Sequence, residues 1–504
     1  MGTKSPGGYT IAAVSLDRES AMALHRQLYK SMRGAILTGQ LRAGTRVPST
    51  RSLAADLDVS RNTILAAFEQ LTAEGYLQGR TGSGTHVTRT IPDELLSVRH
   101  RTSPPKAAVT RRRIASRAAA LPATIAITKD KRRAFEPSLP ALDLFPVKLW
   151  ARLVAGQWSK RGPAMLDALT YGDVAGHPRL RKAIAEYVGA ARGVPCDATQ
   201  VIITNGLQHG LDIVARVLID PGDAVWFEEP GFPTARAALA AAGARLVFVP
   251  VDRDGLDVAR GVAKCPTPRL IYATPSHQFP LGVTMPVTRR LQLLDAARRA
   301  DAWILEDDYD GEYRYSTQPV PAMYGMDRDA RVIYLGTFSK VLFPALRLGY
   351  LIVPPALVDP FLRARAFFGR ASPAIDQAVV ADFIEEGHFE RHIRRMRSAY
   401  RERQEALLAA SARYLTGLAT VSASEAGMHT LAWLHDVEDV AASRAAAEVN
   451  VEAAPLSAFC VESRLDHALL LGYGVVTPRQ IRVSTEVLAR ALERVRGFNG
   501  RARR

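Results

Sequence analysis

The chain has 504 residues, is 47% hydrophobic and carries a formal net charge of +16. This length exceeds one ordinary hydrophobic core, so two or more domains are expected, and the basic balance favours a polyanionic partner. The longest apolar stretches are shorter than the roughly 20 residues of a membrane span, and the polar N-terminus lacks a secretory signal, which predicts a cytoplasmic protein. Cys196, Cys265 and Cys460 are widely separated, with no histidine at ligand spacing, so neither a disulfide nor a metal site is expected.

Short amphipathic helices are predicted at the N-terminal end. Apolar residues recur at helical spacing over 23–37, and the pattern ends at Gly39. A serine or threonine at 49–50 can cap a helix over 51–57, and Ser60 can cap a second helix over 61–74. A short capped helix, a tight turn and a second capped helix are the layout of a helix-turn-helix, a DNA-binding motif.

A glycine-rich hairpin is predicted over 75–87, with two short strands around the tip and with His86 beside it. Such a hairpin can form a wing against the duplex, while the N-terminal residues of the second helix enter the major groove. The residues predicted to bind DNA are Arg51, Ser60, Arg61, Asn62, Thr63, Arg80, Gly82, Ser83 and Gly84. The alternative, a helical bundle without a ligand, explains neither the wing nor the basic segment that follows.

Residues 89–135 have no periodic pattern and are strongly basic. Like charges resist collapse, and the pair Pro104-Pro105 favours extended backbone, so this segment is predicted to be a flexible linker. Two interpretations stay open: a solvated tether, and a tether that also contacts DNA phosphates.

An α/β domain is predicted from about residue 140 to 495. Short apolar runs alternate there with helical patterns, which favours a largely parallel sheet. The predicted strands are 201–204, 224–227, 246–249, 270–273, 303–305, 331–335 and 349–353.

A single lysine stands beside small hydroxyl residues in the segment 336–340, Gly-Thr-Phe-Ser-Lys, and Arg347 follows seven positions after Lys340. This pattern indicates a pyridoxal phosphate site, because the lysine can form a Schiff base with the aldehyde while the hydroxyls and the arginine hold the phosphate. The glycine turn at 204–210, between a strand and a helix, exposes backbone N–H groups that can also hold a phosphate.

Acidic residues follow the predicted strand 303–305, at the edge where α/β proteins bind ligands. A carboxylate such as Asp307 keeps a pyridine nitrogen protonated, and Tyr309 can bond the ring hydroxyl. An acidic surface cluster would explain the acids alone, but not a lysine and an arginine that follow at coherent spacing.

Two resemblances cover most of the chain. Residues 16–88, through the stretches 44–51 and 60–63, closely resemble the winged-helix domain of GntR-type bacterial regulators. Residues 140–495 resemble the fold-type I aminotransferases, and the whole resembles the MocR (GabR-like) subfamily of GntR regulators. The resemblance implies a winged helix-turn-helix joined to a large pyridoxal-phosphate-binding domain with a mainly parallel sheet and a smaller C-terminal α+β subdomain.

The resemblance also implies roles for particular residues. Lys340 matches the Schiff-base lysine, Asp307 the partner of the pyridine nitrogen and Tyr309 the partner of the ring hydroxyl. Phe232 falls where an aromatic ring, commonly a tyrosine, stacks on the pyridine. The implied phosphate-binding residues are Thr337, Ser339, Arg347, Gly206, Leu207 and Gln208, joined by Tyr171 from a partner subunit.

Two further positions bear on the ligand. Arg482, in Ile-Arg-Val-Ser, matches the arginine that clamps the carboxylate of an effector or substrate in a bidentate pair. Aminotransferases usually carry Asn-Pro-x-Gly where this chain has Phe-Pro-Leu-Gly at 279–282, so the asparagine that contacts the ring hydroxyl is absent. His277 or Gln278 is one substitute, and a purely structural role for His277 is the other interpretation.

The leading hypothesis is a transcriptional regulator that binds pyridoxal phosphate covalently and changes its DNA binding when the cofactor, an amine or an amino acid occupies the large domain. The first alternative is a working aminotransferase with an appended DNA-binding domain, and the residues leave slow turnover open. The second is an architectural DNA-binding protein with an inert second domain. We expect a homodimer on repeated half-sites of double-stranded DNA, with no membrane partner.

Overall fold

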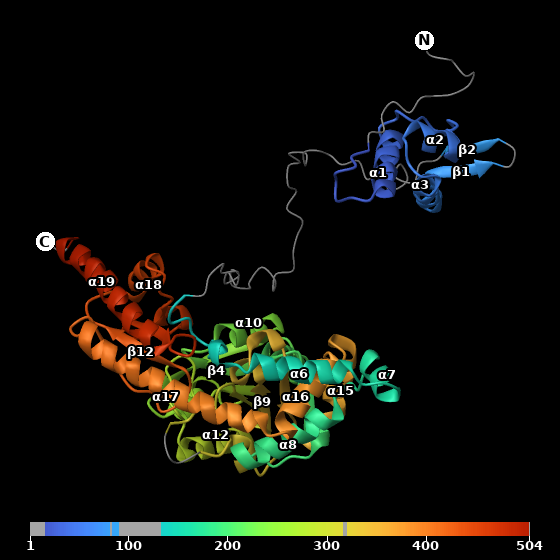
Figure 1. The fold of residues 1–504 in the computed structure, drawn as a ribbon. Coiled ribbons are helices and arrows are strands. Elements are labelled where there is room, and N and C mark those ends of the chain that lie inside the picture. The colour runs from blue at the N-terminus through green and yellow to red at the C-terminus, as the bar shows by residue number, and fades with distance from the viewer. Residues whose placement is uncertain (1–15, 81–82, 90–132, 316–319, 503–504) are drawn as a thin grey trace. The chain divides into compact units, whose positions relative to one another are not determined.

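A computed structural model describes residues 16–80, 83–89, 133–315 and 320–502 (Figure 1). The chain divides into two units, Met1–Arg113 and Ile114–Arg504. Most of the predicted basic linker and Gly82 of the wing tip lie outside the described residues, so the predictions made for them stay predictions. Within the described ranges, no helix combines the length and the apolar character that crossing a membrane requires.

The described part of the N-terminal unit contains three helices and a hairpin: α1 (Leu24–Leu37), α2 (Thr50–Asp56), α3 (Arg61–Ala73), β1 (Leu77–Arg80) and β2 (Gly84–Val87). The predicted caps are confirmed, since the side chains of Ser49 and Ser60 accept hydrogen bonds from the N–H groups of Ser52 and Thr63. The two strands pair antiparallel. Apolar residues from all five elements form one core, which includes Leu28, Leu53, Ile64, Phe68, Leu77 and Val87.

The large unit is built on an eight-stranded sheet that contains all seven predicted strands. Its strand order is β3 (Val201–Thr204), β10 (Gly349–Ile352), β9 (Val332–Thr337), β8 (Trp303–Asp308), β7 (Leu270–Ala273), β4 (Ala224–Glu229), β5 (Arg245–Asp252) and β6 (Gly255–Leu256). The pairs from β9 to β5 are parallel, as predicted, whereas β10 is antiparallel to both of its neighbours and β6 pairs antiparallel with β5.

Helices cover both faces of this sheet, because alternate strand residues point to opposite sides. Val225 and Phe227 of β4 pack in one cluster with residues of α9, α10 and α15, whereas Ala224 and Trp226 pack in another with α11 and α12. These helices are α9 (Leu207–Leu218), α10 (Pro233–Ala241), α15 (Val358–Phe368), α11 (Val258–Lys264) and α12 (Val287–Ala300). The other helices before the C-terminal part are α6 (Val147–Trp158), α7 (Pro163–Leu169), α8 (Pro178–Arg192), α13 (Met323–Met326), α14 (Phe338–Val341) and α16 (Ala374–Glu385).

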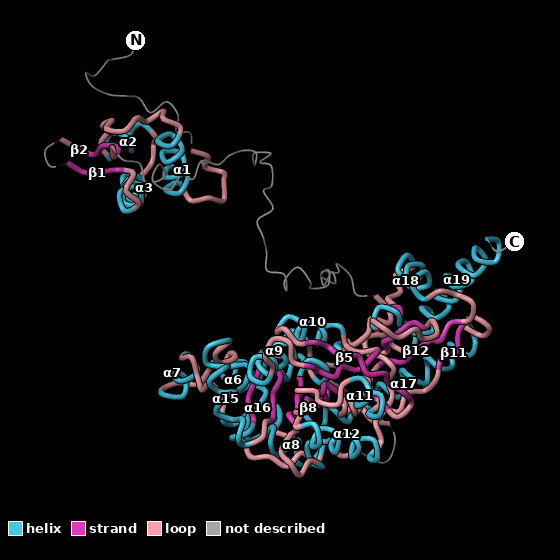
Figure 2. The backbone as a smooth tube through the Cα atoms, turned by 180° about the vertical axis from the view of Figure 1, so that it is seen from behind, coloured by secondary structure: helices cyan, strands magenta, loops and turns pink. Residues whose placement is uncertain are grey.

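The C-terminal part forms the α+β subdomain that the family resemblance implied. Its antiparallel sheet has the order β11 (Ala419–Val421), β12 (His429–Leu434), β14 (Ala468–Gly472) and β13 (Ala454–Pro455). The accompanying helices are α17 (His388–Tyr414), α18 (Asp439–Glu448) and α19 (Pro478–Ala502). Both backbone views place α18 and α19 at one end of the large unit and α7 and α15 at the other (Figure 2).

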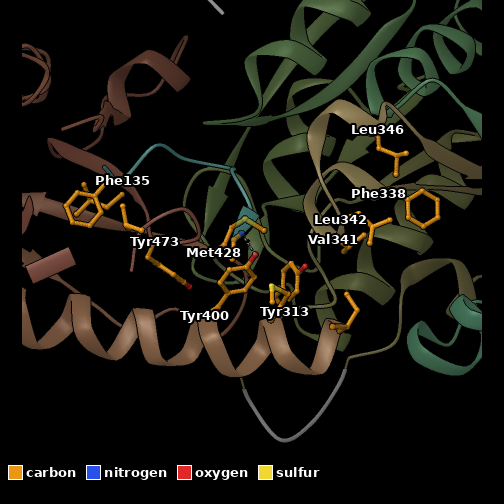
Figure 3. Packing of buried hydrophobic residues seen from close by; sticks show 14 of the residues in the cluster. Phe135, Tyr313, Phe338, Val341, Leu342, Leu346, Tyr400, Met428 and Tyr473 are labelled. Atoms are coloured by element: carbon orange, nitrogen blue, oxygen red, sulfur yellow. Dashed lines mark hydrogen bonds between the residues drawn. The ribbon is translucent and has the colours of Figure 1, made fainter. Parts of the chain in front are cut away.

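One hydrophobic cluster joins this subdomain to the large sheet (Figure 3). Phe338 and Leu342, beside Lys340, pack in the same cluster as Tyr400 of the long helix α17 and Tyr473 just after β14. The Tyr400 hydroxyl also accepts a hydrogen bond from the Ala141 N–H, which anchors the segment that leads into α6. The cluster therefore fixes α14 relative to both sheets.

Candidate functional site

A cavity of about 250 Å³ lies where several strands of the large sheet end. β8 and β9 supply residues at their carboxyl ends, and α9 and α10 begin beside it, which is the usual ligand position in α/β folds. The residues that line it are Ser138, Leu207, Gln208, Phe232, Thr234, Tyr272, Thr274, Phe279, Asp307, Tyr309, Thr337, Ser339, Lys340, Pro344 and Arg347. Most of the residues predicted from the lysine and aspartate motifs thus meet in one place.

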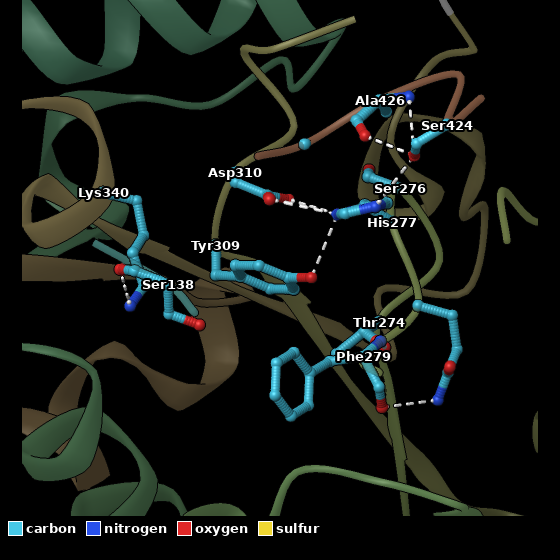
Figure 4. Close-up of polar contacts among 12 residues, drawn as sticks. Ser138, Thr274, Ser276, His277, Phe279, Tyr309, Asp310, Lys340, Ser424 and Ala426 are labelled. Atoms are coloured by element: carbon cyan, nitrogen blue, oxygen red, sulfur yellow. Dashed lines mark hydrogen bonds and ion pairs between the residues drawn. The ribbon is translucent and has the colours of Figure 1, made fainter. Parts of the chain in front are cut away.

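Lys340 lies on α14, directly after β9, and its Nζ donates a hydrogen bond of 2.8 Å to the backbone carbonyl of Ser138 (Figure 4). Burial lowers the pKa of Lys340 to about 8, although the negative charges of Asp310 and Asp307 act in the opposite direction. A lysine with this pKa is neutral far more often at physiological pH than an exposed one, and a neutral amine is the nucleophilic form.

Asp307 lies at the end of β8 and is buried. Its Oδ2 accepts a 2.6 Å hydrogen bond from the Tyr272 hydroxyl, whereas its Oδ1 is buried without a partner among the described residues. Burial, helped by nearby Asp308, raises the pKa of Asp307 to about 7, against the lowering effect of the Tyr272 hydrogen bond. A buried carboxylate oxygen without a donor is costly, so this atom suits a ligand that brings an N–H group.

The opposite end of the cavity suits an anion. Gly206 adopts a φ of 84° and starts α9, so the free N–H groups of the first helical turn, at Leu207 and Gln208, are presented there. The Arg347 guanidinium lies next to Gly206, with its Cζ 3.5 Å from where a Cβ on that glycine would stand. The Thr337 hydroxyl accepts a hydrogen bond from the Ser339 N–H at 3.1 Å, which caps α14 at the same edge.

Aromatic rings form a wall between these two ends. Phe232 precedes the first residue of α10, and its ring meets that of Phe279 edge to face at 5.4 Å between centroids. Phe279 packs in turn against Phe459 at 5.2 Å. Phe232 therefore lies at the cavity, where the predicted stacking role requires it.

Tyr309 reaches a buried polar group behind the cavity (Figure 4). His277 Nδ1 lies 3.0 Å from Asp310 Oδ2 and 3.1 Å from the Tyr309 hydroxyl. Both distances are those of hydrogen bonds, so the imidazole links the Tyr309 hydroxyl to the Asp310 carboxyl group. Neither His277 nor Gln278 lines the cavity, so neither is placed to replace the missing asparagine directly, and His277 contacts Tyr309 instead. The purely structural interpretation of His277 stays a prediction.

His429 completes this buried group. Its ring centroid lies 4.5 Å from that of His277, burial lowers its pKa well below the usual range, and both of its ring nitrogens lack a partner among the described residues. His277, Asp310 and His429 offer ligand atoms within 4.8 Å of one another. The absence of a bound metal stays a prediction.

Arg482 does not lie at the cavity, and the prediction that it clamps a carboxylate there is wrong. It belongs to α19, where its side chain is exposed while the neighbouring Ile481 is buried. The helix begins with a reciprocal cap, in which the Thr477 hydroxyl accepts from the Gln480 N–H and the Gln480 side chain accepts from the Thr477 N–H. Thr-Pro-Arg-Gln at 477–480 is therefore a helix-start signal that sequence reasoning missed.

Tyr171 is also remote from the cavity lining. Its side chain is 78% exposed, and the Arg370 guanidinium lies over its ring at 4.6 Å from the centroid. A contact with a phosphate from this position requires a second subunit, so that role stays a prediction.

Sequence reasoning missed four polar lining residues: Ser138, Thr234, Tyr272 and Thr274. Tyr272 could have been suspected, because it lies near the end of an otherwise apolar strand whose parallel neighbour carries Asp307. Ser138 carries no such signal, since it acts through its backbone carbonyl and is brought to Lys340 from a segment about 200 residues earlier.

The predicted DNA-binding residues lie at the starts of α2 and α3 and on the hairpin. Arg51, Ser60, Arg61 and Asn62 are exposed, and Thr63 is half-buried. In the hairpin, Ser83 and Gly84 are exposed and Gly84 has a φ of +89°. Gly82 lies outside the described residues, and only the backbone of Arg80 is described.

Arg46 is a further exposed cation at the hairpin, one that sequence reasoning did not select. It forms a β-bridge with His86, and its Nε lies 3.0 Å from where a Cβ on Gly84 would stand. The exposed cations and N–H groups on this side of the module suit phosphates and base edges.

Comparison with known proteins separates the same two parts. Residues 24–87 match the family of bacterial regulatory proteins called the gntR family, and residues 162–485 match aminotransferase class I and II. The chain is 45% identical to a probable rhizopine catabolism regulatory protein MocR from Rhizobium meliloti, over 93% of each chain. This chain belongs to the MocR subfamily of GntR-type transcriptional regulators. It therefore joins a GntR-type DNA-binding domain to an aminotransferase-like domain.

Solved structures resemble the large unit of this MocR-type regulator. A kynurenine aminotransferase from Pyrococcus horikoshii superposes with a TM-score of 0.69 at 27% identity, over 76% of this chain and 97% of that chain. LysN, an alpha-aminoadipate aminotransferase from Thermus thermophilus, gives a TM-score of 0.67 at 29% identity, over 73% of this chain and 93% of that chain. The large unit thus has the aminotransferase fold.

Proposed function

We propose that this regulator holds pyridoxal phosphate in the cavity and that its occupancy of DNA changes when the cofactor or an amine ligand binds there. The observation that carries the proposal is the buried, unpartnered Oδ1 of Asp307, in the same cavity as Lys340. The cavity has a hydrogen-bond acceptor without a donor at one end and an anion site at the other. This arrangement matches a molecule that carries a ring nitrogen and a phosphate.

Each residue has a distinct role in this proposal. When bound, pyridoxal phosphate supplies an aldehyde that condenses with amines and a ring that withdraws electrons. Lys340 provides the amine, Asp307 accepts from the ring nitrogen and Tyr309 donates to the ring hydroxyl, while Phe232 covers the ring face. The phosphate is assigned to Thr337, Ser339, Arg347 and the backbone of Gly206, Leu207 and Gln208.

The test of cofactor binding is spectroscopic. Wild-type protein saturated with pyridoxal phosphate and then desalted should keep a visible absorption band, and Lys340→Ala should lose it. Lys182→Ala, at an exposed lysine of α8, is the matched control and should keep the band. A wild type that retains no band after saturation would refute the proposal.

The DNA-binding roles belong to the exposed residues at the start of α3 and on the hairpin. We assign base and phosphate contacts to Arg51, Ser60, Arg61, Asn62, Thr63, Arg80, Gly82, Ser83 and Gly84. We divide the chain into a DNA-binding domain at 16–88, a linker at 89–135 and an effector domain at 140–495. The aminotransferase-like domain then acts as the sensor, and the linker carries its state to the DNA-binding domain.

We propose a homodimer, supported by exposed apolar side chains at one end of the large unit. Leu166 of α7, Tyr171 and Phe367 of α15 are 65%, 78% and 84% exposed. Large apolar side chains gathered in this way mark an interaction surface. Two subunits would present two winged helices, which suits repeated half-sites on DNA.

Slow transamination is a second candidate, favoured by the lowered pKa of Lys340, because an amine that titrates near 8 can also move protons at neutral pH. Incubation with amino acids and a keto acid distinguishes the two functions. Product that accumulates over many turnovers indicates an enzyme, whereas a single spectral change without accumulation indicates a sensor.

A further inference from the structure

The cavity contains few positive charges. Among the described residues that line it, only Lys340 and Arg347 are cationic. The proposed function uses both of them, Lys340 for the cofactor aldehyde and Arg347 for its phosphate. Because Arg482 is exposed on α19, the described lining offers no third cation to a ligand.

One strand of the C-terminal sheet packs behind part of the cavity lining, and this strand is apolar. Along β14, Leu469 and Leu471 point into the core shared with the large sheet, whereas Ala468 and Leu470 point to the other side. There they join a buried cluster with Phe279 and Tyr309, two residues that line the cavity. The lining on this side is therefore backed by aliphatic side chains, and β14 offers no guanidinium to pair with a carboxylate.

Negative charge is more abundant around the same space. Asp307 and Asp310 are both buried and both act electrostatically on Lys340. Glu228, which is buried beneath Thr274, adds a third carboxyl group that acts on Asp307. A ligand carboxylate placed among these groups would lose its hydration and meet repulsion without a compensating cation, whereas a ligand ammonium would be attracted.

We propose that the effector of this regulator is a primary amine that carries no carboxylate, with a neutral body that contacts the apolar wall at Phe279. This inference rests on the proposed function and specifies its ligand class. The amine would enter beside Lys340, and its body would cover apolar surface. Amino acids would be excluded by charge, not by size.

The test compares matched pairs that differ by one carboxylate: tyramine with L-tyrosine, 3-methylbutylamine with L-leucine, and ethanolamine with L-serine. Each is titrated into desalted, pyridoxal-phosphate-loaded full-length protein, and both the visible spectrum and DNA binding are recorded. In at least one pair, the concentration at which the amine acts should be lower than that of its amino acid by roughly tenfold or more. Equal potency, a preference for the amino acids, or no response to any amine would overturn the inference.

Failure of the proposed function gives a different result, because the protein would then show no visible band before any ligand is added. Free pyridoxal phosphate titrated with the same compounds controls for reaction in solution. Arg236, on α10, has a buried Nη1 without a partner among the described residues, so Arg236→Gln is included. If this variant loses a response to amino acids that the wild type shows, Arg236 is an anion clamp and the inference is wrong.

A gain-of-function variant probes the wall directly. Leu470→Arg adds a guanidinium on the side of β14 that packs against Phe279 and Tyr309. It should shift the preference of a pair toward the amino acid by roughly tenfold or more, while Leu470→Met, similar in size, should not. Retention of the cofactor band shows that each variant folds. If folded Leu470→Arg keeps the wild-type preference between amine and amino acid, the role given to this apolar wall is wrong. If the variant does not fold, the titration of the wild type decides the inference.

Discussion

At the scale of single residues, the properties of Lys340 and Asp307 come from their surroundings. Burial lowers the pKa of the lysine to about 8 and raises that of the aspartate to about 7. Both shifts favour the neutral form, as desolvation requires. Because both pKa values lie close to physiological pH, we expect loading with the proposed cofactor to depend on pH.

We expect the rate of cofactor loading to follow the neutral fraction of Lys340. Because its folded pKa is depressed to about 8, the rate should rise roughly tenfold per pH unit below pH 8 and level off above it. Stopped-flow growth of the visible band after mixing cofactor-free protein with pyridoxal phosphate measures this. Nα-acetyl-lysine is the control, with a rate that still rises near pH 10. If the loading rate of the protein also still rises near pH 10, the pKa of Lys340 is not lowered.

Tyr272→Phe should weaken cofactor retention at pH 7 and less so at pH 9. The tyrosine hydroxyl holds down the pKa of Asp307, so its removal raises that pKa further and leaves more of the carboxyl protonated at pH 7. The loss of one hydrogen bond to a charged group corresponds to about 1.5 kcal/mol, or roughly tenfold in retention. Equilibrium dialysis gives the measurement, with Tyr324→Phe on α13 as control. An equal defect at both pH values would exclude this electrostatic role.

At the scale of elements, capped helix starts decide where side chains point. Ser60 caps α3 and leaves Arg61 exposed at its first position, whereas the cap at Thr477 starts α19 and turns Arg482 to solvent. The function of an exposed arginine on a helix depends on the molecule that binds to that surface of the helix. For α3, the hairpin beside it indicates DNA.

Arg61→Ala should weaken operator binding while leaving the cofactor band intact. The loss of a contact to a base or a phosphate costs about 1–3 kcal/mol, so the dissociation constant should rise by roughly 5-fold to 150-fold. Fluorescence anisotropy at fixed salt measures it, and Arg444→Ala, an exposed arginine of α18, should bind as the wild type does. Loss of the band together with DNA binding would point to a folding defect instead.

At the scale of the whole molecule, the proposed function requires that the aminotransferase-like domain be coupled to the DNA-binding domain. In a dimer, two DNA-binding domains could bind two half-sites. The exposed apolar residues of α7 and α15 lie at the end of the large unit opposite to α18 and α19 (Figures 1 and 2). Any subunit that covers them would also approach Tyr171, which is exposed at Arg370.

Phe367→Asp should shift the protein toward monomer. The side chain is 84% exposed in the single chain, and a charge buried in an apolar interface costs several kcal/mol. Size-exclusion chromatography with light scattering, in the presence of pyridoxal phosphate, reports the mass. Leu291→Asp on α12 is the control, at a leucine that is 51% exposed elsewhere on the same unit. A wild type that is monomeric under these conditions would contradict the dimer.

The sequence by itself determined what depends on neighbours along the chain. Caps and apolar runs identified the helices of the first module within one residue, together with all seven predicted strands of the large sheet. The lysine and aspartate motifs identified six of the fifteen residues that line the cavity, because α/β topology brings the carboxyl ends of parallel strands to one edge.

Only the tertiary structure decided what depends on contacts between distant segments. The Ser138 carbonyl meets Lys340 across about 200 residues, and Tyr272 meets Asp307 because their strands are neighbours. The short strands of the C-terminal sheet carry too little periodicity to be located in the sequence, yet their pairing turns Leu470 toward Phe279 and Tyr309. The packing of α19 leaves Arg482 exposed. Side-chain direction is set by strand pairing and helix packing, which is why the character of the ligand pocket emerged only from the folded molecule.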